Sequence, residues 1–307
     1  MKRAVIREVG LRDGLQMVTA DLPTEHKLEW IAEAVSAGLT EIEVTSFVPP
    51  KTFPIFADAA AVAEAALKTP GLSASALVVN LRGAQDAFAS GLRHINYVLS
   101  ASEAHSRANA RRTTAEAVAE FGRIVALRDN LGLETAVEFS CGIATAFGCS
   151  LQGEVSLDRV LDLAAQLEGS GAAEVMLADT VGYATPGQVE RAFGELRQRL
   201  PEIRLSAHFH DTRGLGLANI AAALRVGVTR FDASIGSLGG CPYAPGATGN
   251  VNAEDAAYLL ESEGFDTGID IPRLLTLRRK VESWLPGERF SGAIARAGFP
   301  RTAAAAR

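Results

Sequence analysis

Short apolar segments alternate with longer segments of helical periodicity along most of this chain, and this alternation constrains the fold more than any other feature. The expected strands are rich in β-branched and apolar residues; they are residues 4–9, 41–45, 75–79, 94–99, 134–139, 174–177, 204–207 and 230–234. Eight strands, each followed by a helical segment, predict an α/β fold of the TIM (β/α)8 barrel type.

Two of the expected helices carry clear N-terminal signals. Thr113 stands three residues before Glu116, and Thr185 is followed by Pro186 and Gln188, so both segments have capping-box patterns. Further helices are expected at about residues 25–37, 57–67, 156–167, 215–224 and 254–263. An open doubly wound sheet is the alternative fold, but no Gly-x-Gly-x-x-Gly run follows the first expected strand.

The domain organisation follows from the absence of an obvious linker. No stretch rich in Pro, Gly or Ser divides the 307 residues, a length that suits one large barrel. We expect one catalytic barrel domain over residues 1–285, including C-terminal helices that begin at about Ile271. Residues 286–307 are expected to form an extension with a frayed, alanine-rich tail.

Composition excludes several classes of function. A net charge of −6 argues against a nucleic-acid-binding protein, which would usually carry a basic face. No apolar run of 18 residues and no signal peptide is present, so we expect no membrane association and a cytoplasmic protein. Three cysteines are too few for a disulfide framework, and a reducing compartment fits them. The run Arg278-Arg279-Lys280 is either a solvated face or a site for a phosphorylated ligand.

Two histidines one residue apart are the strongest chemical signal. His208 and His210 follow an expected strand, where side chains alternate between faces, so both point to the same side. This spacing suits the binding of one divalent metal ion by both rings. A structural role is the alternative interpretation for each histidine taken alone.

Other polar residues fall at the same expected end of the barrel. Arg12 and Asp13 follow the first strand, Asp179 follows the sixth, and Asn250 lies in a Gly-rich loop after the eighth. Glu43 lies inside the second strand, where a buried charge needs a partner. Asp179 as a helix cap and Asp13 in a plain turn are the simpler interpretations of single residues. Taken together, these residues indicate a metal-centred active site at one face.

The donor types restrict the metal. Asp13, His208, His210 and Asn250 offer oxygen and nitrogen donors without a thiolate. This set favours Mg²⁺ or Mn²⁺ over zinc and leaves Co²⁺ open. Such an ion would act as a Lewis acid and template for a substrate with neighbouring oxygens.

A loop at residues 237–250 is the third element of the expected site. It contains four glycines and two prolines in fourteen residues, a composition that allows it to move over the barrel mouth. Cys241 lies within it. A free cysteine is often a small apolar filler, but beside a metal site a role in proton transfer is the stronger hypothesis.

Four motifs resemble those of 3-hydroxy-3-methylglutaryl-CoA (HMG-CoA) lyase. They are Glu8-Val-Gly-Leu-Arg-Asp-Gly-Leu-Gln16, Ile42-Glu-Val-Thr-Ser-Phe47, His208-Phe-His-Asp-Thr212 and Leu238-Gly-Gly-Cys-Pro-Tyr243. The resemblance extends from about residue 3 to residue 285. The Gly-Gly-Cys-Pro-Tyr loop is the most specific motif, because related synthases share the Arg-Asp and His-x-His elements.

The resemblance implies a metal-dependent retro-Claisen cleavage of an acyl-CoA thioester. Asp13, His208 and His210 would hold the metal, and Asn250 would complete or support the set. Glu43 would orient a ligand or metal-bound water, and Arg12 would face the thioester oxygen.

Two further roles complete the implied reaction. Cys241 would protonate the enolate carbon, and Asp179 would help to remove the hydroxyl proton. The products would be acetyl-CoA and acetoacetate, and the family suggests a homodimer.

The chain also departs from the family pattern. After Asp-Gly-Leu-Gln the family typically continues Asn-Glu-Lys, whereas this chain has Met17-Val18-Thr19; Ile55-Phe56 stand where Gln-Met is frequent. These changes remove polar donors near the expected acyl pocket, so a related 3-hydroxyacyl-CoA such as citramalyl-CoA stays open as substrate. A condensing acyl-CoA/2-oxo acid synthase of the same metalloenzyme group, and a non-enzymatic barrel, are the alternative functions.

Overall fold

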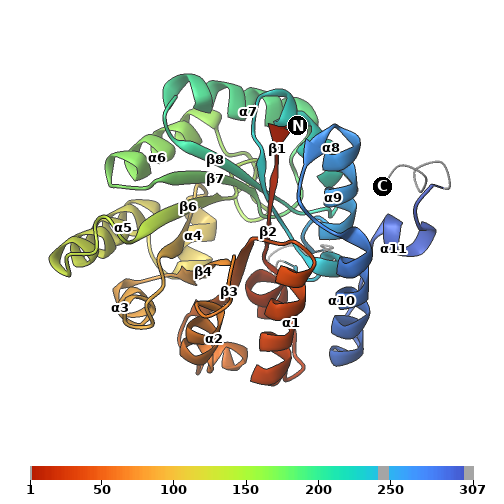
Figure 1. The fold of residues 1–307 in the computed structure, drawn as a ribbon. Coiled ribbons are helices and arrows are strands. Elements are labelled where there is room, and N and C mark those ends of the chain that lie inside the picture. The colour runs from red at the N-terminus through yellow and green to blue at the C-terminus, as the bar shows by residue number, and fades with distance from the viewer. Residues whose placement is uncertain (1, 241–248, 301–307) are drawn as a thin grey trace.

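The expected barrel is confirmed by a computed structural model of the chain, which describes residues 2–240 and 249–300. Eight parallel strands close into a barrel in the order in which they occur along the chain (Figure 1). They are β2 (Val5–Glu8), β3 (Glu41–Phe47), β4 (Ser73–Val78), β5 (His94–Ser100), β6 (Glu138–Ala144), β7 (Glu174–Asp179), β8 (Arg204–Phe209) and β9 (Arg230–Ala233).

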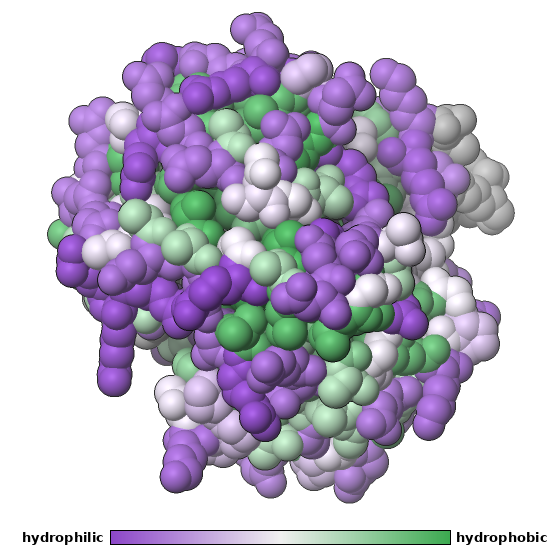
Figure 2. All heavy atoms as spheres, turned by 90° about the vertical axis from the view of Figure 1, so that its left-hand side faces the viewer, coloured by the Kyte–Doolittle hydropathy of each residue, from purple (hydrophilic) through white to green (hydrophobic). Residues whose placement is uncertain are grey.

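Helices surround the barrel. They are α1 (Thr24–Ser36), α2 (Ala59–Ala66), α3 (Leu81–Ala89), α4 (Glu103–Ala110), α5 (Thr114–Asn130), α6 (Leu157–Gly169), α7 (Pro186–Arg199), α8 (Gly216–Arg225), α9 (Ala253–Ser262), α10 (Ile271–Trp284) and α11 (Ala293–Ala297). Their inner faces bury large side chains against the strands, including Trp30, Phe121 and Phe193. Figure 2 shows that hydrophilic side chains cover much of one outer face, with hydrophobic atoms between them.

The two expected capping boxes are present. Thr113 and Glu116 bond reciprocally at the start of α5, and Thr185 and Gln188 do so at the start of α7. These contacts satisfy backbone N–H groups that have no partner within the helix, and they therefore define where each helix begins.

The fifth expected strand was placed too early in the chain. The sequence pattern predicts a strand at residues 134–139, whereas β6 covers Glu138–Ala144. The strand contains small residues of low strand propensity because its neighbours leave little room. A Cβ at Gly142 would lie 2.9 Å from Met176 Cε and 3.1 Å from a methyl group of Val98. Helices α3 and α4 were not predicted.

A small second sheet lies beside the barrel. Its strands are β1 (Lys2–Arg3) and β10 (Phe265–Asp266), which pair in parallel. Helix α10 then begins at Ile271, as expected, and packs against α1. The division at residue 285 stays a prediction.

Ion pairs fill the barrel interior at the first residues of the strands. Arg7 of β2 donates to Glu174 of β7 at 2.5 Å, and Arg230 of β9 donates to Glu174 at 3.0 Å and to Glu41 of β3 at 2.6 Å. Hydrogen bonds from Ser140 and Ser206 also reach Glu174. The interior below the expected site is therefore polar and tightly paired.

The structure also bears on membrane-spanning helices and on the cysteines. Among residues 2–240 and 249–300, no helix has the length and apolar character needed to cross a membrane. Cys141 and Cys149 are buried free thiols.

Candidate metal centre and active site

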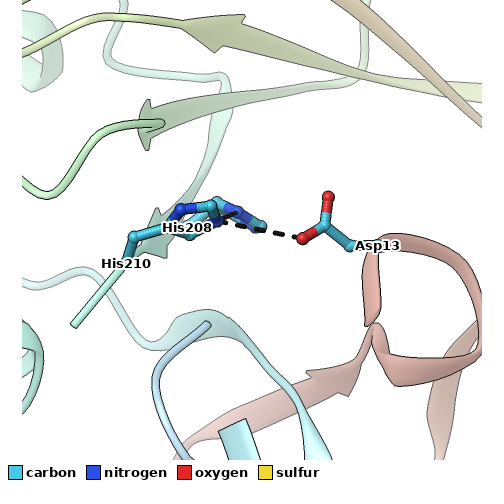
Figure 3. A group of neighbouring side chains, drawn as sticks. All are labelled: Asp13, His208 and His210. Carbon is cyan, nitrogen blue, oxygen red and sulfur yellow. Dashed lines mark hydrogen bonds and ion pairs between the residues drawn. The ribbon is translucent and has the colours of Figure 1, made fainter. Parts of the chain in front are cut away.

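The barrel places three expected metal ligands side by side. His208 lies near the end of β8, His210 follows that strand, and Asp13 lies in the turn η1 (Gly10–Gly14) after β2. One ligand atom from each of the three lies within 4.8 Å of the others. Figure 3 shows both imidazole rings and the carboxylate pointing toward one another. His208 and His210 therefore point to the same side, as the alternation of side chains along a strand predicts.

The ring nitrogens indicate what this centre can bind. The Nε2 atoms of His208 and His210 lie 3.1 Å apart, and His210 Nε2 lies 3.8 Å from Asp13 Oδ2. Asp232 Oδ2 lies 3.2 Å from His208 Nδ1, which can donate its proton there and leave the Nε2 lone pair facing the centre. Two facing nitrogens and a carboxylate fit a divalent cation.

Asn250 is joined to this centre. Its Nδ2 donates to Asp13 Oδ2 at 2.8 Å and to the carbonyl of Leu238 at 3.1 Å. Its Oδ1 is buried and has no hydrogen-bond partner within the described part of the chain. A buried unsatisfied oxygen is costly, so the donor set fits a cation that would satisfy it.

The electrostatic environment favours an anionic Asp13 beside the rings. Burial alone would raise the pKa of Asp13, but the Arg12 guanidinium and His210 hold that pKa well below its ordinary value. Burial disfavours the charged form of His208 as well and would lower its pKa. The hydrogen bond to Asp232 and the charge of Asp13 outweigh this effect and raise the pKa of His208.

Arg12 is held in place from two sides. Its Nε donates to Glu43 and its Nη1 donates to Asp13 Oδ1 at 2.6 Å. Glu43 is buried inside β3 and also accepts from Asn96 Nδ2 at 2.7 Å. The expectation that Glu43 needs a partner is confirmed, and its partner is Arg12. The guanidinium is thereby fixed next to the metal centre.

Asp179 occupies the last position of β7 and is buried. Its carboxylate accepts the backbone N–H of Tyr183 at 2.7 Å and that of Ala184 at 3.0 Å. Burial raises the pKa of Asp179, while these hydrogen bonds and the charges of the two histidines oppose the rise. The residue therefore holds the loop after β7 in place, close enough to the two histidines to be affected by their charge.

Cys241 lies outside the described residues, but both ends of its loop are described. A Cβ on Gly239 would lie 2.7 Å from Asn250 Nδ2, and one on Gly249 would lie 2.1 Å from the carbonyl oxygen of Ser237. The two ends of the loop therefore pass each other beside Asn250 with no room for side chains. The close approach of the two segments explains why Gly239 and Gly249 carry no side chain.

Three residues near the centre were missed by the sequence analysis. They are Asp232 beside His208, Asn96 beside Glu43, and Glu8. Glu8 Oε1 accepts from the backbone N–H of Gly10 at 2.9 Å and of Ile235 at 3.2 Å, joining the turn that carries Arg12 to η4 (Ile235–Ser237). Asp232 had the same signal as Glu43, a charge inside an apolar strand.

The residues that depart from the family pattern differ in position. Met17 is exposed and lies near Gly240, with 3.9 Å between its Cγ and a Cβ built on that glycine. Val18 and Ile55 are partly buried against the core. Phe56 is buried in the hydrophobic core.

Comparisons with known proteins agree with these observations. Residues 3–281 match the family described as HMGL-like. A hydroxymethylglutaryl-CoA lyase of Bacillus subtilis is 39% identical over 281 residues, covering 92% of this chain and 93% of the relative. An (R)-citramalyl-CoA lyase of Chloroflexus aurantiacus is also 39% identical, over 93% of this chain and 90% of the relative.

A solved structure gives the same result. The HMG-CoA lyase of Acinetobacter baumannii, in complex with coenzyme A and 3-methylmalate, has a TM-score of 0.90 and 38% identity, over 97% of this chain and 96% of that one. The resemblance inferred from the motifs is therefore confirmed, and the chain belongs to the HMGL-like family of the HMG-CoA lyases.

Proposed function

We propose that this chain is a divalent-metal-dependent carbon–carbon lyase that cleaves HMG-CoA or a close 3-hydroxyacyl-CoA such as citramalyl-CoA. Acetyl-CoA and an oxo acid would be the products. The observation that carries the proposal is the grouping of Asp13, His208 and His210 within 4.8 Å, next to a fixed Arg12. The relatives named HMG-CoA lyase and citramalyl-CoA lyase support the reaction class and the two candidate acyl groups.

Mg²⁺ or Mn²⁺ is the proposed ion. Asp13, His208 and His210 would hold it, and the unpartnered Oδ1 of Asn250 suits a fourth ligand. Such an ion supplies Lewis acidity toward oxygens of the bound substrate and fixes their orientation.

Arg12 would stabilise the charge that forms during cleavage. In a retro-Claisen cleavage the substrate hydroxyl loses its proton, the C2–C3 bond breaks, and its electron pair becomes the thioester enolate. Arg12 would face the enolate oxygen, and Glu43 would keep the guanidinium in place. A donor fixed before the reaction is worth about 3–4 kcal/mol at the transition state.

Two proton-transfer roles complete the proposal. Asp179 would help to remove the hydroxyl proton, because its carboxylate is buried at the end of β7 beside the strand that carries His208, and burial raises its pKa. Cys241 would protonate the enolate carbon from the Gly-rich loop. Alkylation by iodoacetamide should then inactivate the enzyme, and a bound substrate analogue should slow that inactivation.

The reaction can be tested by mass spectrometry of products from a panel of 3-hydroxyacyl-CoA thioesters with Mg²⁺. We expect acetyl-CoA and the matching oxo acid. HMG-CoA should be handled less well than a less polar relative, because the side chains of Met17, Val18 and Ile55 offer no hydrogen-bond donor to the carboxylate of its acyl group. The substrate preference is wrong if HMG-CoA is the best of the panel, and the lyase proposal is wrong if no thioester is cleaved.

The same assay separates lyase from synthase. Acetyl-CoA mixed with a 2-oxo acid would give net condensation in a synthase, and we expect net cleavage instead. We also propose a cytoplasmic homodimer, which light scattering after size-exclusion chromatography can test by giving twice the mass of the chain.

A further inference from the structure

A cavity lies between α10, α11 and the segment that joins them. Figure 1 shows these two helices on the outer side of the barrel. Its volume is about 480 Å³, within the range of small-molecule sites. Three arginines and one glutamate line it: Arg278, Arg279, Arg296 and Glu282. The chain as a whole carries a net charge of −6, so this positive cluster is a local exception.

The three arginines differ in how far they are already neutralised. Arg278 is buried, donates to Glu282 at 2.8 Å, and lies 3.7 Å from Glu254. Arg279 and Arg296 are exposed, and neither has a carboxylate within 4.0 Å among the described residues. The guanidinium groups of Arg279 and Arg296 therefore line the cavity without a carboxylate partner. That of Arg278 is held by two glutamates.

Specific contacts build the wall of this cavity. The carbonyl of Ser291 accepts from Arg278 Nη1 at 2.6 Å and from Asn252 Nδ2 at 2.8 Å. The carboxylate of Asp255 accepts the backbone N–H groups of Ala293 and Ile294 at the start of α11. The wall is thus fixed before any ligand binds, which lowers the entropic cost of binding.

The wall is also joined to the active-site end of the barrel. The N–H of Ser291 donates to the carbonyl of Gly236 at 2.9 Å. Gly236 has φ +63°, and a Cβ there would lie 2.4 Å from the Phe290 ring. Leu238, whose carbonyl accepts from Asn250, is two residues further on, at most about 7.6 Å away along the chain. A ligand in the cavity would therefore lie near the base of the Gly-rich loop.

We propose that this cavity is a binding site for the phosphate groups of an anionic ligand. Guanidinium groups bind phosphate oxygens through paired hydrogen bonds, and Arg279 and Arg296 have donors free of acidic partners for this purpose. Leu275, Phe290 and Ala295 supply an apolar surface for a group attached to the phosphates. The ligand is either the phosphate-bearing end of the acyl-CoA substrate, which rests on the proposed function, or a separate phosphorylated metabolite.

The test is a calorimetric titration of the full-length protein with adenosine 3′,5′-bisphosphate. We expect measurable binding to the wild type and at least tenfold weaker binding to Arg279→Ala/Arg296→Ala, two exposed positions whose change should leave the fold intact. Arg273→Ala is the matched control, because Arg273 lies on the same helix outside the cavity and should leave the affinity unchanged. Absent binding, or equal affinity in all three proteins, overturns the proposal.

A competition step identifies the source of the phosphate. If coenzyme A displaces the bisphosphate and pantetheine does not, the site takes the substrate's own phosphates. If the bisphosphate binds equally in the presence of saturating coenzyme A, the site takes a separate phosphorylated ligand. Both outcomes support the anion site. Because binding is measured without turnover, failure of the lyase assay and failure of this proposal are distinguishable.

Discussion

The two ends of the barrel interior both bury charge, but they differ in how completely that charge is paired. At the first residues of the strands, Glu174 accepts hydrogen bonds from four donors. Arg7 and Arg230 supply two of them, and Ser140 and Ser206 supply the others. Both carboxylate oxygens of Glu174 are thus hydrogen-bonded, although Arg7 Nη1 has no hydrogen-bond partner among the described residues, and this end has the properties of a structural network.

At the opposite end the same interior leaves polar atoms without partners. His210 Nδ1 and Asn250 Oδ1 have no hydrogen-bond partner in the described part of the chain, and the Nε2 atoms of His208 and His210 lie 3.1 Å from each other. Burial and charge are alike at the two ends, so they do not distinguish a site from a scaffold. A site is distinguished from a scaffold by unsatisfied donors and acceptors that converge on one point.

One ion pair connects the two ends. Arg7 Nη1 lies 3.7 Å from Asp232 Oδ1, and Asp232 Oδ2 lies 3.2 Å from His208 Nδ1. Asp232 is therefore shared between the network and the metal centre. Changes at either end can test whether the two are functionally separate, from the largest expected effect to the smallest.

The largest effect is expected from His208→Ala/His210→Ala. Removing both imidazoles should lower the rate of thioester cleavage by more than about 1,000-fold, since an ion that stabilises charge contributes several kcal/mol. EDTA should have a similar effect on the wild type, and added Mg²⁺ or Mn²⁺ should restore the rate. Full activity of a metal-free wild-type sample would contradict the metal-centred account.

Glu174→Gln should instead act on stability. The change leaves the buried Arg7 without the carboxylate that it shares with the partly exposed Arg230, at a cost of about 3–5 kcal/mol. Urea unfolding measures this loss, and the folded fraction should still bind metal with wild-type affinity. A variant of unchanged stability would show that this end is not the structural one.

Arg12→Gln should lower kcat by about two orders of magnitude with little change in KM, because the guanidinium acts on charge present only near the transition state. Steady-state kinetics on the best thioester of the panel measures both constants. An effect confined to KM would assign Arg12 to substrate binding instead.

Asp232→Asn should weaken metal binding by about 10- to 100-fold while leaving the ligand set intact, since the carboxylate orients His208. Calorimetric titration with Mn²⁺ gives the affinity. Glu138→Gln is a matched control on the exposed rim, where Glu138 pairs with Arg204. Equal affinity in wild type and Asp232→Asn would remove Asp232 from the account.

The last effect is a change of stability with pH, which is small over any single pH unit. Burial raises the pKa of Glu8 from 4.5 to about 7, although backbone N–H groups, first that of Ile235, oppose the rise. The folded state therefore holds a proton that the unfolded chain loses between these pH values, and the stability contributed by this proton is lost as pH rises from about 4.5 to 7. Glu8→Gln removes this term.

The difference in unfolding free energy between the wild type and Glu8→Gln should therefore change by up to about 1.4 kcal/mol per pH unit in this window. Urea unfolding at a series of pH values measures it. The wild type should lose stability relative to the variant as pH rises. A difference that is constant with pH would contradict the raised pKa.

Most of the barrel could be predicted because its signals are local. Capping boxes and apolar alternation report neighbours within a few residues, as at Thr113 and Thr185. The segment 140–144 was missed because small residues are required there by contacts with β5 and β7, which are distant in sequence. Tertiary packing outweighed local propensity in this strand.

The candidate metal-binding group could be predicted, but the residues that support it could not. His208, His210 and Asp13 are of types that bind metals, and all three follow expected strands at one end of the barrel. Asn96 and Glu8 act through partners far along the chain, and no local pattern announces such contacts. Asp232 could have been predicted, because it is a charged residue inside an apolar strand, the same pattern that indicated Glu43.

The central claim is that unsatisfied atoms mark one end of the barrel interior as the metal site. Electron paramagnetic resonance of Mn²⁺ titrated into the wild type, Glu174→Gln and His208→Ala/His210→Ala tests it directly. The account predicts one bound ion per chain in the wild type and in folded Glu174→Gln, and none in the histidine variant. One bound ion in the folded histidine variant, at wild-type affinity, would contradict it.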